Sequence, residues 1–194
     1  MTPLEIAGNA FTIASVHLAR RNSVHTWWTG MLAVSLYGVM FFGVKLYADL
    51  LLQVFFFGTC VVGWRQWRHG GVGGSELPIS RLDARRRAVA IAAILALALG
   101  FGTAFSRFTD AALPFADSFI LAGSVVAQLL MMRRKFDHWA IWIAVDVVAV
   151  IVYAAKGLYL TSVVYAGLLV LCLFGVVEWR RILATQGVRT DALR

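Results

Sequence analysis

The sequence predicts an all-α integral membrane protein with seven transmembrane helices, and three observations support that prediction. Only 14% of its 194 residues are charged, whereas a soluble domain carries about 25%. The apolar residues form long runs, and runs of about 20 residues are what a bilayer core of about 30 Å requires. The basic residues gather in the segments between these runs. Such a chain has too few charges to cover a water-exposed surface.

The apolar runs give the expected positions of the seven spans. One long segment, 65–87, interrupts the otherwise short connections, and its glycine-rich stretch 70–75 has the composition of a flexible linker. This stretch lacks the Lys-Ser/Thr ending of a phosphate-binding loop. The expected spans are 4–19, 27–44, 47–64, 88–106, 116–132, 139–155 and 159–177.

The distribution of Lys and Arg predicts the orientation of the chain. Lys45, Arg107 and Lys156 fall on one side of the membrane, and all the other Lys and Arg residues fall on the opposite side. Basic residues in short loops stay in the cytoplasm, so we expect a multi-pass protein of the bacterial inner membrane with a periplasmic N-terminus and a cytoplasmic C-terminus. The net charge of +8 does not indicate nucleic-acid binding, because the basic residues do not line one groove or helix face.

The chain also contains an internal repeat, because residues 5–68 align on residues 117–180 without a gap, at an offset of 112. Each copy holds three spans, and the span between the copies restores the orientation of the second one. The result is a 3+1+3 plan of parallel repeats, as in SWEETs, with a substrate site expected near the midplane of the seam between the two bundles. The residues in register include Trp27 with Trp139, Tyr47 with Tyr159, Cys60 with Cys172, Gly63 with Gly175 and Trp67 with Trp179. The expected parts are the first repeat 1–68, a loop and linker helix 69–108, the second repeat 109–181 and a cytoplasmic tail 182–194.

Asp146 is the strongest candidate for a functional residue. It lies near the middle of the sixth span, where an ionisable side chain costs at least about 2.5 kcal/mol on insertion scales. Trp139, Trp142 and Tyr153 share a helix face with it, since their spacings are three, four and seven residues. A carboxylate flanked by aromatic rings suits a flat polar ligand, including a cationic one. A structural hydrogen bond to a neighbouring helix is the alternative explanation.

Other polar residues in the spans are weaker candidates. Gln53 and Gln128 bring paired donors and acceptors into the third and fifth spans, although such amides also join helices. Asp49 lies one turn before Gln53, in the first turn of its helix, where the helix dipole favours a negative charge. Asp117 begins the fifth span and is interpreted as a helix cap.

The motifs of catalytic and metal sites do not occur in the sequence. There is no His-Glu-x-x-His, no Ser/His/Asp constellation and no nucleotide loop, so we expect no enzyme activity and neither a metal nor a cofactor. Cys60 and Cys172 lie deep in apolar runs and are interpreted as small buried hydrophobes.

Several of these residues stand in an order that resembles the PnuC family of bacterial vitamin transporters. Its third-helix signature resembles residues 45–57 followed by Gly63, Trp64 and Trp67. Its second-half signature resembles a series of polar and aromatic residues that ends in the sixth and seventh spans. That series comprises Asp117-Ser118, Ser124, Gln128, Arg133-Arg134-Lys135, Trp139, Trp142, Asp146, Gly157-Leu158-Tyr159 and Tyr165.

The resemblance implies a function and a site. Members of the family move a vitamin or its precursor by facilitated diffusion, intracellular phosphorylation traps the product, and trimers are known. In the family a Trp-x-x-Trp motif and nearby amides line the site, which corresponds here to Trp139, Trp142, Gln53 and Gln128. The family position four residues after the second Trp is often Asn in nicotinamide riboside transporters, whereas this chain has Asp146.

Several functions remain open at this point. Nicotinamide riboside is the first candidate substrate, and thiamine and riboflavin are alternatives because the family has branches for both. Nicotinamide riboside and thiamine both carry a ring cation that a carboxylate could pair with. A proton-coupled carrier that uses Asp146 is a third possibility. In a different class, the chain would be a membrane scaffold subunit whose buried polar groups only hold helices together.

Overall fold

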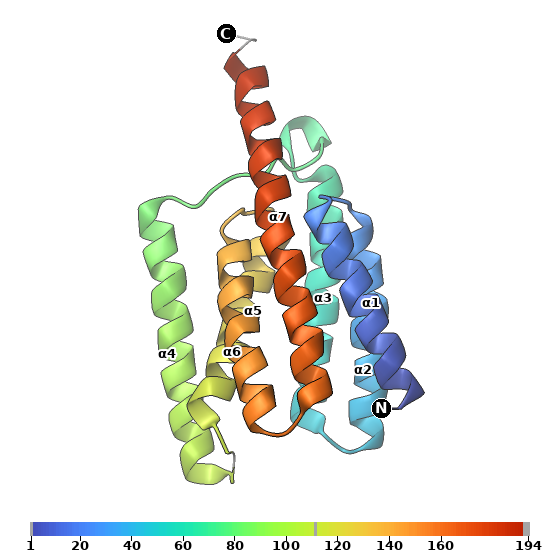
Figure 1. Cartoon of the computed structure of the whole chain (residues 1–194). Helices are drawn as coiled ribbons and strands as arrows, with labels where there is room; N and C mark the ends of the chain where they lie inside the picture. The colour runs from blue at the N-terminus through green and yellow to red at the C-terminus, as the bar shows by residue number, and fades with distance from the viewer. Residues whose placement is uncertain (1, 111, 192–194) are drawn as a thin grey trace. The chain divides into compact units, whose positions relative to one another are not determined.

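The computed structural model describes residues 2–110 and 112–191, with the side chains of 47, 48 and 187–191 left out. Within these residues the chain forms seven α-helices and one short 3₁₀ turn (Figure 1). This confirms the all-α, seven-helix prediction. The elements are α1 (Pro3–Arg20), α2 (His25–Gly43), α3 (Tyr47–His69), η1 (Val72–Gly74), α4 (Ala84–Phe108), α5 (Pro114–Met132), α6 (His138–Ala155) and α7 (Tyr159–Asp191).

Four of the described helices are long and apolar enough to cross a membrane. They are α4, α5, α6 and the part of α7 from Tyr159 to Gln186. That α1, α2 and α3 also cross the membrane stays a prediction. In α1, Glu5, Asn9 and His17 interrupt the apolar residues.

Two helices extend well beyond the predicted spans. α3 continues to His69 and α7 to Asp191, although the apolar runs end near 64 and 177. Arg, Gln and Glu are good helix formers, so the backbone hydrogen bonding continues where the apolar run stops. Hydropathy marks the part of a helix that suits a bilayer and not the end of the helix.

The chain divides into two compact units, each described here by itself. The first unit comprises the residues up to Ile79, Met132–Arg134 and the chain from Val177 onward. Its centre is a cluster of tryptophans. Trp67 packs edge-on against Trp27 at 5.2 Å between ring centroids and contacts Trp179 at 5.8 Å. The Arg134 guanidinium lies 4.7 Å from the Trp67 ring centroid, at cation–π distance.

The second unit comprises Ser80–Met131 and Lys135–Val176. It contains α4, α5 and α6 and the part of α7 before Val177. Apolar side chains of α4, α5 and α6 form its core. They are Ile94, Ala98 and Ala122, with Phe119, Val126 and Ile141 packed against them.

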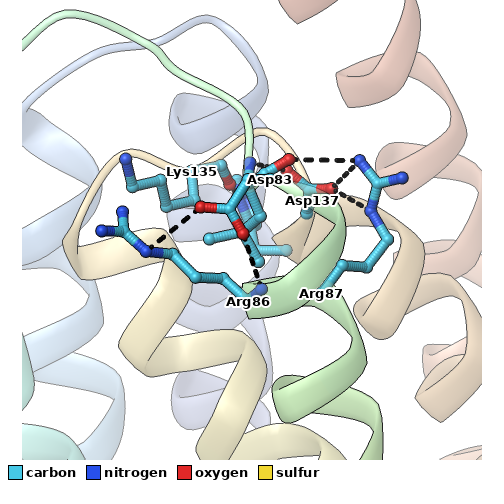
Figure 2. Close-up of polar contacts among 7 residues, drawn as sticks. Asp83, Arg86, Arg87, Lys135 and Asp137 are labelled. Atoms are coloured by element: carbon cyan, nitrogen blue, oxygen red, sulfur yellow. Dashed lines mark hydrogen bonds and ion pairs between the residues drawn. The ribbon is translucent and has the colours of Figure 1, made fainter.

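Figure 2 shows how the start of α4 is attached to the turn between α5 and α6. The Asp137 carboxylate accepts hydrogen bonds from the Leu82 amide at 2.7 Å and from Arg87 Nε at 2.9 Å. The Lys135 ammonium donates to the Ser80 hydroxyl at 2.7 Å. Asp83 caps α4, since its side chain accepts from the Arg86 amide at 2.7 Å. We name this arrangement the Asp137 clamp, comprising Ser80, Leu82, Arg87, Lys135 and Asp137.

Local features of the first three helices recur in the last three at the offset of 112. Arg20 and Met132 end α1 and α5, and Gly43 and Ala155 end α2 and α6. Positive φ angles recur in the same way, at Asn22 (55°) with Arg134 (52°) and at Lys45 (60°) with Gly157 (74°). Such angles are uncommon outside glycine, so their recurrence in register is a specific likeness between the two halves of the sequence.

A close approach of helices also occurs twice. A Cβ atom at Gly63 would lie 2.5 Å from the Trp27 ring, and a Cβ at Gly175 would lie 2.6 Å from the Trp139 ring. In each case a tryptophan near the start of one helix fills the space that a glycine of the next helix leaves open. The two contacts fix the register of α2 on α3 and of α6 on α7.

The Asp137 clamp gives a first prediction. Asp137→Ala should destabilise the protein by about 1–3 kcal/mol, because the Leu82 amide and Arg87 lose their acceptor. Asp83→Asn is the matched control, since Asn is as good an N-cap as Asp. Thermal melting in detergent micelles measures both variants. An unchanged melting temperature for Asp137→Ala would contradict a structural role for the clamp.

The glycine contacts give a second prediction. Gly175→Ala should destabilise by about 1–3 kcal/mol, because the methyl group forces the Trp139 ring out of place. Gly167→Ala on the same helix, with nothing within 4 Å of the new methyl group, should leave stability unchanged or raise it by up to about 1 kcal/mol. If the two variants melt alike, the close approach of α6 and α7 is absent.

Candidate functional site

The candidate site lies where α6 and α7 pack together inside the second unit. The chain turns tightly between them at Gly157, whose φ is 74°, so the two helices run antiparallel. Four contacts follow one another along this boundary, which we call the α6–α7 seam. They join Trp139 to Gly175, Asp146 to Cys172, Val150 to Ser162 and Tyr153 to Tyr165.

Asp146 is the central group of the seam. Its side chain is buried, with the residue 3% exposed, and Oδ2 accepts a hydrogen bond from the Cys172 thiol at 3.3 Å. Among the described residues, no group is placed to donate to Oδ1. A thiol is a weak donor, and a buried carboxylate without strong partners is costly. The site therefore offers an acceptor and a negative charge that the protein itself satisfies only weakly.

Two tyrosines lie on the same seam, two turns along α6 from Asp146. The rings of Tyr153 and Tyr165 are 5.1 Å apart between centroids and inclined by 31°. Both residues are half-buried. Aromatic faces of this kind can contact a flat ring or a cation, so the seam combines an aromatic surface with a buried carboxylate.

The structure places the two tryptophans of the predicted site differently from one another. Trp139 is only 1% exposed, and its ring lies against Gly175, so much of its surface is used in helix packing. Trp142 is half-buried. Gln128, on α5, belongs to the same unit and is 8% exposed. That these three residues contact a ligand stays a prediction.

The remaining two predicted residues, Gln53 and Asp49, lie on α3 in the first unit. Gln53 is half-buried and packs near Gly38 of α2, where a Cβ would lie 3.9 Å from the Gln53 Cβ. Asp49 is exposed in the first turn of α3. Neither residue belongs to the α6–α7 seam defined above, and their roles in ligand binding stay predictions.

Sequence reasoning missed two polar partners. Cys172 was interpreted as a buried hydrophobe; it is buried, but it also donates a hydrogen bond to Asp146. Asp117 was interpreted as a cap, and its carboxylate oxygens lie 2.6 and 2.7 Å from Lys156 Nζ. No sequence pattern indicated the first, because the pairing depends on how α7 is rotated against α6. Opposite charges at the ends of adjacent spans were the signal for the second.

The described part of the chain contains no group of three or more His, Cys, Asp or Glu side chains that could hold a metal ion. The acidic groups of the second unit are separated along the helices. Asp146 lies in the middle of α6, whereas Asp117 lies in the first turn of α5 and Asp137 directly precedes α6. The chemistry that the seam offers is charge pairing and ring contact.

Comparison with known proteins adds independent information. The chain is 28% identical to the nicotinamide riboside transporter PnuC of Escherichia coli over 211 residues, covering 96% of this chain and 88% of that protein. It is also 28% identical to the riboflavin/roseoflavin transporter RibM of Streptomyces davaonensis over 184 residues, covering 90% and 83%. A crystal structure of the vitamin B3 transporter PnuC matches with a TM-score of 0.72 at 23% identity, covering 94% of this chain and 82% of that one. This structural likeness shows a common fold.

A family model covers nearly the whole sequence. The model described as "Nicotinamide mononucleotide transporter" matches residues 2–181, which include all seven helices apart from the end of α7. The PnuC family predicted from the polar and aromatic residues is confirmed by this match together with the PnuC relatives. The chain is therefore a multi-pass membrane protein that belongs to the nicotinamide mononucleotide transporter family.

Proposed function

We propose that this protein carries nicotinamide riboside across the bacterial inner membrane by facilitated diffusion. The Escherichia coli relative is named for that substrate. The observation that supports the proposal most directly is the buried Asp146 carboxylate, whose Oδ1 has no donor among the described residues. Nicotinamide riboside carries a pyridinium cation in a flat ring, so it can pair with this carboxylate while the ring contacts Tyr153 and Tyr165.

A passive carrier only equilibrates its substrate, so net uptake needs a reaction that removes the vitamin inside the cell. Phosphorylation does this, because the added charge makes the product a poor ligand for a site that already contains a carboxylate. The proposal of uniport agrees with a sequence that carries no nucleotide-binding loop.

We extend the proposal to the arrangement of the chain in the membrane. The repeated helix ends and positive φ angles support a 3+1+3 plan of parallel repeats, similar to SWEETs. The excess of Lys and Arg in one set of loops supports a periplasmic N-terminus and a cytoplasmic C-terminus. The resemblance to the PnuC family supports a homotrimer.

Riboflavin is a second candidate substrate, because RibM matches 90% of the chain. Riboflavin has a flat ring without a fixed cation, so it would use the aromatic surface of the seam more than the carboxylate. Thiamine carries a ring cation and would use both, as nicotinamide riboside does. If the chain were a scaffold subunit, none of these compounds would bind.

Ligand-induced stabilisation distinguishes these possibilities. Nicotinamide riboside should raise the melting temperature of the purified protein, because a ligand that binds only the folded state stabilises it by about 2.7 kcal/mol at 100 times its Kd. Thiamine and riboflavin are tested in parallel at equal concentration. A shift with riboflavin alone would assign the second substrate, and no shift with any of the three would favour the scaffold.

The charge of Asp146 gives a further prediction. Asp146→Asn should weaken nicotinamide riboside binding about tenfold, because a charge contact at a desolvated site contributes about 1–2 kcal/mol. The reduced form of the riboside has the same shape without the cation, and its affinity should change much less. Asp83→Asn, at the exposed N-cap of α4 and outside the candidate site, is the control carboxylate. Equal losses for both forms of the riboside would remove the charge-pairing argument.

Uniport itself predicts the response to a proton gradient. In vesicles that contain the purified protein, uptake of nicotinamide riboside should follow the riboside gradient and should not depend on a pH difference across the membrane. Uptake against the riboside gradient, driven by an inward proton gradient and lost in Asp146→Asn, would instead establish a proton-coupled carrier.

A further inference from the structure

We propose that Cys172 is a positioning residue of the vitamin site. Its thiol holds one oxygen of the Asp146 carboxylate and so directs the other oxygen to the cation of the ligand. This inference rests on the proposed function, and it assigns a role to a residue that neither the sequence motifs nor the family resemblance singled out.

The geometry of the seam supports this role. Cys172 Sγ lies 3.3 Å from Asp146 Oδ2, and the two residues are each 3% exposed. The thiol comes from α7, whereas the carboxylate belongs to α6. Asp146 Oδ2 has this donor and Oδ1 has none among the described residues. The contact therefore limits the rotation of the carboxylate and makes its two oxygens different.

The first half of the chain provides a natural comparison. Cys60 is in register with Cys172 and is similarly buried, at 5% exposed. The residue in register with Asp146 is Val34, so Cys60 has no carboxylate at the corresponding position. The Cys60 thiol instead lies close to Gly30, where a Cβ would be 3.3 Å from Sγ. The two thiols therefore occupy equivalent positions in the repeat. The helix that packs against Cys172 carries an acid, Asp146, whereas Val34 stands at that position in the first half.

The donor strength of a thiol suits the proposed role. A hydroxyl or an ammonium group would form a stronger hydrogen bond with the carboxylate, and the ligand cation would then compete with it. A thiol donates weakly, so it orients the carboxylate while leaving most of its charge for the ligand. We expect the contribution to be modest, because a single weak hydrogen bond is involved.

The experiment measures nicotinamide riboside binding by calorimetry on the full chain in detergent micelles. Cys172→Ala should weaken binding about fivefold, as the loss of one weak hydrogen bond predicts. Cys172→Ser keeps a donor, so it should bind more tightly than Cys172→Ala but less tightly than the wild type, because the stronger hydroxyl donor competes with the ligand cation. Cys60→Ala is the matched control and should bind as the wild type does. If Cys172→Ala fails to fold, Cys172→Val removes the same donor and fills the space.

A double-mutant cycle separates positioning from packing. In the Asp146→Asn background, Cys172→Ala should cause no further loss of affinity, because the charge that the thiol orients is gone. A thiol that only fills space would lower affinity by the same factor in both backgrounds, and that result would overturn the inference. Wild-type affinity in Cys172→Ala would overturn it equally.

The outcomes also distinguish this inference from the function on which it rests. If the wild-type protein binds nicotinamide riboside and Asp146→Asn weakens binding while Cys172→Ala does not, the inference alone fails. If the wild-type protein does not bind nicotinamide riboside, the proposed function fails and the inference falls with it.

Discussion

The rest of the site depends on one constraint, which is the burial of the Asp146 carboxylate between two apolar helices. A carboxylate in such surroundings is costly, and the Cys172 thiol is a weak partner for it. The close packing of α6 and α7 elsewhere offsets this cost in free energy. The contact of the Trp139 ring with Gly175 makes that close packing possible. The same register that seats this ring also brings Asp146 to Cys172 and Tyr153 to Tyr165. Packing and chemistry are thus two results of one helix alignment.

The two halves of the chain share the helix packing but differ in the buried acid. The first half has the same tryptophan–glycine contact, at Trp27 and Gly63, but Val34 stands in register with Asp146. The scaffold of the helix pair is therefore present twice and the buried acid once. Helix α4 belongs to the unit that carries the acid, and the Asp137 clamp attaches its start to the turn before α6.

Sequence reasoning could predict the helices and the candidate acid, but not all of the contacts. The apolar runs located seven helices because a run near 20 residues is a strong signal. They did not give the ends of α3 and α7, since helix formation continues into polar sequence. Asp146 was found because a charge in an apolar run is conspicuous. Its Cys172 partner was not found, because the pairing depends on how α7 is rotated against α6, which no local pattern fixes.

The weakness of the thiol contact has a consequence for the passive transport proposed above. A passive carrier must release its substrate as well as bind it, so the occupied site cannot be much more stable than the empty one. A Lys or Arg opposite Asp146 would pair with the carboxylate, as Lys156 pairs with Asp117, and would exclude a cationic vitamin. A carboxylate with no partner at all would favour protonation over ligand binding. A buried thiol lies between these limits, because it keeps the carboxylate oriented without supplying a countercharge. In the proposed function, the ligand cation would supply that countercharge on entry, and its departure would return the carboxylate to a partner that held it only weakly.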